Sequence, residues 1–141
     1  MMDNLGLLLL LIAVFLIAIV GVVFLALAMK RAPELDRTRY QANWLAIEHS
    51  VKNDNPSSWQ LAVINADKLL DQALRERRFS GKTMGERMKA AQSTWHNANH
   101  IWNAHKIRNQ LAHETDARVT HDVTLRALAA YRQGLKDLGA I

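Results

Sequence analysis

A long apolar run near the N-terminus dominates the pattern of hydrophobic and polar positions. No charged residue occurs from Asn4 to Met29, and most positions in that run are Leu, Ile, Val, Ala or Phe. As an α-helix rising about 1.5 Å per residue, the run would measure roughly 37 Å, enough to cross a hydrocarbon core about 30 Å thick. The pattern predicts a single transmembrane anchor over residues 1–29.

Two other structures are compatible with an apolar run of this length, namely the buried helix of a soluble protein and a cleaved signal peptide. The tripeptide Ala26-Leu27-Ala28 has the small-x-small form that signal peptidase accepts. However, the leader Met1-Met2-Asp3-Asn4 lacks basic residues, and the run is longer than a typical signal-peptide core. An uncleaved anchor is therefore the preferred interpretation.

The charges that flank the run predict its orientation. Lys30, Arg31, Arg37 and Arg39 follow it, whereas the leader carries only Asp3. The positive-inside rule then places the N-terminus outside and the bulk of the chain in the cytoplasm of a single-pass membrane protein. The absence of cysteine agrees with a reducing compartment without requiring one.

After residue 29, apolar residues recur at helical spacing and no segment alternates with a period of two. We expect residues 30–56 to form a juxtamembrane segment with a first amphipathic helix, and residues 57–141 to form a helical bundle. The expected helices cover about 34–51, 57–78, a short segment opened by Thr83, 94–113, and a last stretch from about 121. The fold class is therefore all-α, with four principal helices and a short one behind the transmembrane helix.

Two pairs of residues have the spacing of a capping box, in which a Ser or Thr and a Glu or Gln three positions later satisfy the first N–H groups of a helix. Ser57 with Gln60 predicts the start of the second soluble helix, and Thr83 with Glu86 predicts the start of the short helix.

The soluble part is strongly basic. It contains all 18 Lys and Arg residues but 12 of the 13 acidic residues, which leaves a net charge of +6. This balance favours partners that carry phosphate, such as RNA, nucleotides or anionic lipid headgroups. The alternative is that part of the charge serves only to fix the membrane topology.

The segment from Arg108 to His113 holds the candidate chemistry. Arg offers a planar set of donors that matches phosphate oxygens, and His titrates near neutrality. Residues five apart on an α-helix point about 140° apart, so these two side chains do not lie side by side. Either the helix loosens before His113, or Arg108 reaches round it, or a second chain completes the site across a two-fold axis. His105 and Asn109 lie on the same helical stripe as His113.

The sequence HKIRNQLAHE, from His105 to Glu114, resembles the Arg-(polar)-x-x-x-His signature of the HEPN superfamily, the higher eukaryotes and prokaryotes nucleotide-binding domains. The resemblance covers roughly residues 59–141. It implies a small helical bundle that forms a homodimer or higher homo-oligomer and binds RNA or a nucleotide, with metal-independent endoribonuclease activity in some members. It also implies that His113 acts as general acid or base, that Arg108 stabilises the phosphorane and that Asn109 orients the phosphate or the imidazole.

The same residues are also compatible with a purely structural role. Arg108 would pair with an acid on a neighbouring helix, Asp67 or Asp71, and His113 would cap the end of its helix. His105 would be an interhelical hydrogen-bonding residue. On this interpretation the protein is a non-catalytic, membrane-tethered scaffold or oligomerisation module.

Two further groups of residues have features of a binding site. His96 and His100 are four apart and would share a metal ion on one helical face, but no cysteine or clear third ligand accompanies them, so neither a metal nor a cofactor is expected. The four tryptophans would suit base stacking, but their placement on apolar stripes predicts core packing instead. They are Trp44, Trp59, Trp95 and Trp102.

Overall fold

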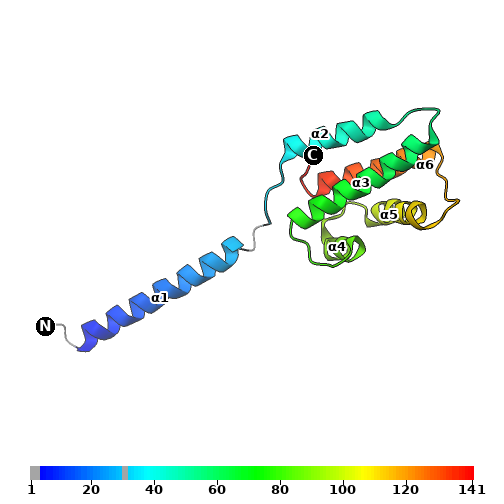
Figure 1. Ribbon diagram of the computed structural model, residues 1–141. Coiled ribbons are helices and arrows are strands. Elements are labelled where there is room, and N and C mark those ends of the chain that lie inside the picture. Colours follow the sequence, from blue (N-terminus) through cyan, green and yellow to red (C-terminus); the bar gives the residue numbers. More distant parts are fainter. Residues whose placement is uncertain (1–3, 30–31) are drawn as a thin grey trace. The chain divides into compact units, whose positions relative to one another are not determined.

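The computed structural model describes residues 4–29 and 32–141 and divides the chain into two compact units. One unit contains the apolar N-terminal helix, and the other spans Pro33–Ile141 (Figure 1). Every regular element in the described part of the chain is helical, which confirms the all-α prediction.

Helix α1, Asn4–Met29, is the predicted apolar helix. Its segment Asn4–Ala28 is long and apolar enough to cross a membrane, and none of it is buried within the protein. A signal sequence meets the same criteria of length and composition, so the anchor and its orientation stay predictions.

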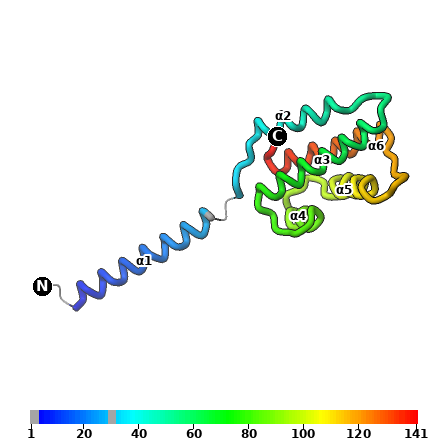
Figure 2. The backbone as a smooth tube through the Cα atoms, viewed as in Figure 1, coloured from blue at the N-terminus to red at the C-terminus, as the bar shows by residue number. Residues whose placement is uncertain are grey.

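The second unit is a bundle built around a central pair of helices, α3 (Pro56–Glu76) and α6 (His121–Asp137). Helix α2 (Arg37–Ser50) packs on one side of α3, and α5 (Ala98–His113) packs against both α3 and α6 on the other side (Figures 1 and 2). The short helix α4 (Met84–Ala90) joins α3 to α5 through a 3-10 turn. The four principal helices and one short helix agree with the periodicity of the sequence.

The start of α3 differs from the prediction. Asn55, not Ser57, is the N-cap, and its side chain accepts a hydrogen bond from the Ser58 N–H at 3.3 Å. Pro56 then occupies the first helical turn, where its missing N–H costs nothing. The predicted cap of α4 is confirmed, because Thr83 Oγ1 accepts from the Glu86 N–H at 3.2 Å. Glu86 in return accepts from the N–H of Lys82, the residue before the cap.

The start of α5 also differs from the prediction. The helix begins at Ala98 with Asn97 as its N-cap, not at Thr94, and Trp95 lies in extended backbone before it. Trp95 is buried there, and its Nε1 donates to the Met88 carbonyl at 2.9 Å. The indole therefore anchors the connection between α4 and α5, and it does not belong to a helical stripe.

The hydrophobic core lies between α3 and its neighbours. Trp44 and Trp95 are buried in it, which confirms core packing for these two tryptophans, while Trp59 and Trp102 are partly buried. Helix α6 packs closely on α3 and α5 at Gly134, where an added Cβ would lie 3.2 Å from both Leu70 and Ile101 methyl groups. This close packing fixes α3, α5 and α6 relative to one another and so positions the groups described next.

Candidate functional site

An open cleft of about 730 Å³ lies between α3, α4 and α5. It brings together three of the four predicted site residues, His105, Arg108 and Asn109, with charged residues of the other two helices. The remaining lining residues are Asp67, Lys68, Asp71, Arg75, Lys82, Thr83, Met84, Gly85, Arg87 and Trp102.

Asp67 is the centre of a buried polar cluster that joins three helices. Its carboxylate, on α3, is nearly inaccessible to solvent. One oxygen, Oδ1, accepts from the Tyr131 hydroxyl of α6 at 2.9 Å and lies 2.8 Å from His105 Nδ1 of α5. The other oxygen, Oδ2, lies 3.2 Å from Arg108 Nε.

These contacts determine which ring nitrogen of His105 carries the proton. Burial, and secondarily the charge of Asp67, raises the pKa of Tyr131, so its phenol keeps its proton and donates. An ionised carboxylate only accepts hydrogen bonds, so with Asp67 in that form the contact at His105 Nδ1 takes an N–H on that nitrogen. In the neutral imidazole, Nε2 is then left as an acceptor.

Arg108 is engaged by the protein itself. Its guanidinium forms an ion pair with Asp67, and its Nη1 donates to Asn109 Oδ1 at 3.1 Å. The Nε group makes no well-directed hydrogen bond to the carboxylate, so charge proximity is the main attraction in this pair. The structural interpretation of Arg108 as the partner of an acid on a neighbouring helix is confirmed, with Asp67 as that acid.

A second buried ion pair docks α4 onto α3. Arg87 donates to Asp71 Oδ1 through Nε at 2.8 Å and Nη2 at 2.6 Å, and to the Gly81 carbonyl through Nη1 at 2.8 Å. Arg75, one turn along α3, contacts the other carboxylate oxygen of Asp71 from an exposed position. The two carboxylates of the cleft are thus both neutralised by arginine.

His113 lies apart from this cleft. It is the last residue of α5 and is exposed. The helix stays α-helical to that point, where the Glu114 N–H bonds to the Gln110 carbonyl at 2.9 Å, so it does not loosen before His113. Because Arg108 turns toward Asp67, a second chain is the one remaining geometry that would join Arg108 to His113.

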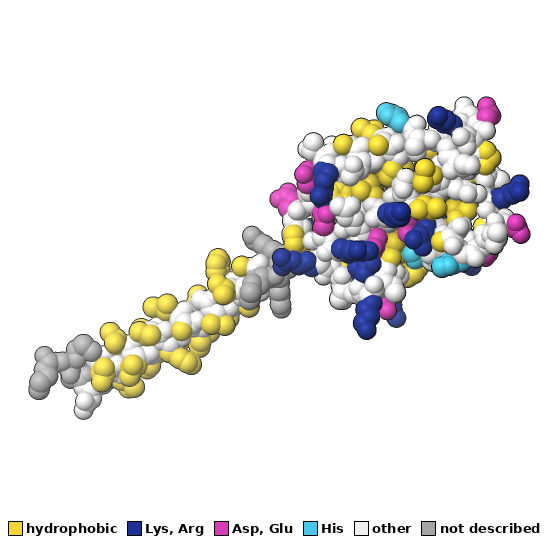
Figure 3. Space-filling view, in the orientation of Figure 1, with side chains coloured by type: hydrophobic (Ala, Val, Ile, Leu, Met, Phe, Trp, Pro, Cys, Tyr) yellow, Lys and Arg dark blue, Asp and Glu magenta, His cyan; other side chains and the backbone are white. Residues whose placement is uncertain are grey.

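The cleft is electropositive. Five of its lining side chains are cationic and two are carboxylates, and the exposed cations are Lys68, Arg75 and Lys82. Figure 3 shows Lys and Arg side chains gathered on the face formed by α3, α4 and α5. The sequence did not predict these cations as site residues, nor the hydrogen bond from Tyr131 to Asp67. The sequence indicates a polar site at Asp67 and Asp71, because these two acids interrupt the apolar stripe of α3.

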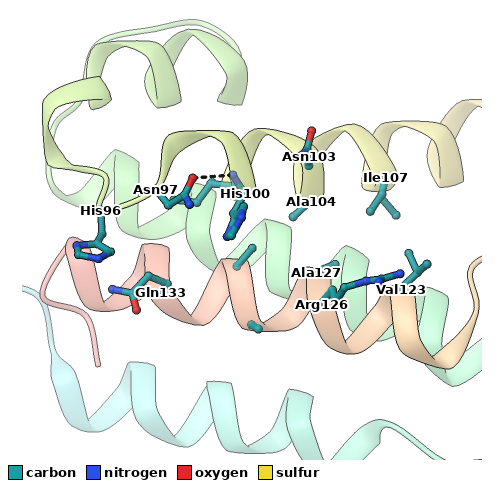
Figure 4. A pocket seen from close by; sticks show the side chains of 13 residues that line it. His96, Asn97, His100, Asn103, Ala104, Ile107, Val123, Arg126, Ala127 and Gln133 are labelled. Carbon is teal, nitrogen blue, oxygen red and sulfur yellow. Dashed lines mark hydrogen bonds between the residues drawn. The ribbon is translucent and has the colours of Figure 1, made fainter.

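A second cavity, of about 670 Å³, lies between α5 and α6 (Figure 4). Ala104, Ile107, Val123 and Ala127 give it a mainly apolar floor, and His100 also points into it. Its other lining residues are His96, Asn97, Ile101, Asn103, Arg126, Ala129, Ala130 and Gln133.

The suggested pairing of His96 with His100 on one helical face is wrong, because His96 precedes the N-cap of α5. Within residues 4–29 and 32–141, no three His, Cys, Asp or Glu side chains are grouped in a way that would hold a metal ion.

No family model matches this chain, and no curated protein or solved structure shows significant similarity to it. The HEPN resemblance therefore rests on the motif between His105 and Glu114 and on the helical fold class.

Proposed function

We propose that this chain is a membrane-anchored, HEPN-like helical domain that self-associates and binds RNA or a nucleotide through the basic cleft between α3, α4 and α5. The observation that carries the proposal is the surplus of exposed cations over free carboxylates in that cleft. Phosphates are the ligands that such a surface attracts most strongly.

The chemistry of the individual side chains supports a phosphate ligand. Asp67 and Asp71 already have arginine partners, so neither carboxylate is free to repel an anion. Lys68 and Lys82 are exposed and line two walls of the cleft, formed by α3 and by the loop before α4. A nucleic-acid backbone lying between the two walls would contact both lysines.

A binding measurement tests this proposal. The full chain in detergent micelles is titrated into a fluorescein-labelled single-stranded RNA, and anisotropy is followed over a series of salt concentrations. The double variant Lys68→Glu/Lys82→Glu should bind more weakly. Loss of two phosphate contacts should also reduce the slope of log K against log salt by about 1.4.

The matched control carries the same change of charge on other faces of the bundle. Lys52 and Lys136 are exposed and lie outside the cleft. The double variant Lys52→Glu/Lys136→Glu should keep the wild-type salt slope. Equal loss of affinity in both double variants would show that net charge alone drives binding and would remove the cleft from the proposal.

The proposed orientation, with the bundle in the cytoplasm, has its own test. The chain contains no cysteine, so Ser93→Cys introduces a single thiol at an exposed position. In sealed right-side-out vesicles, a membrane-impermeant maleimide should leave this thiol unlabelled until the membrane is broken. Immediate labelling would place the bundle outside.

A second candidate function is a non-catalytic, membrane-tethered assembly module. Two observations favour it, namely the ion pair that ties Arg108 to Asp67 and the open apolar cavity between α5 and α6. On this proposal Ile107→Glu, on the cavity wall, lowers the oligomer mass measured in detergent by light scattering. RNA binding is then weak, and the Lys68→Glu/Lys82→Glu variant binds RNA with the same affinity as wild type. The dimer expected from the HEPN resemblance is measured in the same experiment.

A further inference from the structure

We infer that the apolar cavity between α5 and α6 binds a free fatty acid, with the carboxylate at Arg126 and the acyl chain along the floor of the cavity. This cavity and the basic cleft lie against different faces of α5 and share no lining residue. Binding of a fatty acid here therefore does not require the proposed binding of RNA.

The floor of the cavity is apolar because small side chains line it. Ala104, Ala127 and Ala130 are buried there and leave a space that larger side chains would fill. The two helices are already in contact beside this space, since an added Cβ at Gly134 would lie 3.2 Å from an Ile101 methyl group. Binding sites for apolar ligands often lie between the helices of a bundle and measure about 300–1,000 Å³. At about 670 Å³, this cavity is within that range.

The length of the cavity matches one acyl chain. Its lining residues run from Asn97 to Ile107 on α5 and from Val123 to Gln133 on α6. Ten steps of about 1.5 Å give about 15 Å along each helix. Half of a hydrocarbon core about 30 Å thick is also about 15 Å, which is the depth that the acyl chains of one leaflet fill. A single chain would thus cover the floor from end to end.

Arg126 gives one end of the cavity a positive charge. Among the described residues that line the cavity, it is the one side chain with a permanent charge, and none of them is Asp or Glu. Figure 4 shows its side chain extending toward Val123. Its partner Asp122 lies 3.0 Å away and is 76% exposed, and an exposed pair of this kind contributes little stability. The guanidinium is therefore able to bind the carboxylate of a ligand.

The charge at the opposite end of the cavity disfavours a carboxylate. The two oxygens of Asp137 accept hydrogen bonds from the His96 N–H and from the Gln133 amide, both at 2.8 Å. These two partners line the cavity at the end away from Arg126 (Figure 4). The charges therefore orient the ligand, with its carboxylate at Arg126 and the methyl end of its chain near His100, which points into the cavity.

A photolabelling experiment tests this site. The full chain in lipid nanodiscs is illuminated with a laurate analogue that carries a diazirine at its methyl end, and the adducts are mapped by mass spectrometry of peptides. Adducts should form in α5 and α6 near His100 and Gln133. Excess laurate should remove them, whereas methyl laurate, which has the same chain but no free carboxylate, should not. Adducts in α1 measure the amount of probe in the lipid and serve as the internal reference.

Three variants separate the site from general effects of charge. Arg126→Glu should lower the yield of adducts in α5 and α6 about fivefold relative to α1, because the carboxylate loses its partner. Arg132→Glu makes the same change on the same helix, at an exposed residue outside this cavity, and should keep the wild-type yield. Ala130→Phe fills the floor and should also lower the yield, with tryptophan fluorescence as the check that this variant is folded.

The other outcomes would overturn the inference. Adducts confined to α1 in wild type would exclude the site, and if Ile107→Glu then lowers the oligomer mass, a second copy of the chain covers the cavity instead. An equal loss in Arg126→Glu and Arg132→Glu would show that net charge, not the cavity, attracts the probe. Unchanged adducts in Arg126→Glu would remove the carboxylate from Arg126. None of these results bears on RNA binding in the basic cleft, and failure of RNA binding would leave the fatty-acid site standing.

Discussion

Removal of the Asp71 carboxylate should destabilise the bundle more than removal of its exposed arginine partner. Asp71→Ala leaves the Arg87 guanidinium in place, and that side chain is only 8% exposed. Of the three hydrogen bonds that Arg87 makes, only the one to the Gly81 carbonyl survives. A buried charge stripped of its partner typically costs about 3–5 kcal/mol.

The expected shift in melting temperature follows from the size of the unit. Unfolding entropies near 2.1 cal/mol/K per residue give about 0.23 kcal/mol/K for the roughly 110-residue unit Pro33–Ile141. Asp71→Ala should therefore lower Tm by about 13–22 °C. Arg75→Ala removes a partner of the same carboxylate, but its side chain is 66% exposed, so the loss should be about 1 kcal/mol or less.

Tryptophan fluorescence is the suitable assay, because all four tryptophans lie in the bundle and none lies in α1. Thermal and urea unfolding of the full chain in detergent thus report on the bundle alone. A loss below about 1 kcal/mol for Asp71→Ala, or an equal loss for both variants, would refute the argument that desolvation makes the Asp71–Arg87 pair costly to break.

Two further predictions concern local interactions. Asn55→Ala should destabilise the bundle by about 1 kcal/mol through loss of the α3 cap, while Ser57→Ala should have little effect; the reverse order in urea unfolding would restore Ser57 as the cap. Hydrogen bonds from Gln72 and Arg39 lower the pKa of Glu76 from its ordinary value of 4.5. The ionised carboxylate therefore stabilises the bundle at pH values above 4.5, and this contribution is lost as the pH falls below 4.5 toward the lowered pKa. Glu76→Gln should flatten the acid limb of the stability curve, and an unaltered limb would contradict this account.

The periodicity of apolar residues predicted the helices well, because burial of one face is what stabilises a helix in a bundle. It did not predict where α3 and α5 begin. At α3, Asn55 competes with Ser57 for the same terminal N–H groups, and Pro56 suits the position directly after Asn55. At α5, Trp95 has the spacing of a helical stripe, but its indole is buried through an irregular segment instead.

The candidate site was predictable only in part. The sequence predicts that Arg108 pairs with either Asp67 or Asp71. These two acids are one helical turn apart on α3, so tertiary packing decides which of them forms the ion pair. Asp71 forms an ion pair with Arg87 of the short helix α4. The hydrogen bond from Tyr131 depends on the close approach of α6 at Gly134, and spacing within a single helix carries no information about it.

Helix α5 supplies one wall to each of the two cavities. His105, Arg108 and Asn109 face the basic cleft, and Ala104 and Ile107 face the apolar cavity. A partner that shifts α5 when it fills the apolar cavity would therefore also move the cleft. Such coupling is reciprocal: the factor by which the partner changes RNA affinity equals the factor by which RNA changes affinity for the partner. Assembly state and ligand occupancy would then be two readouts of one conformational equilibrium.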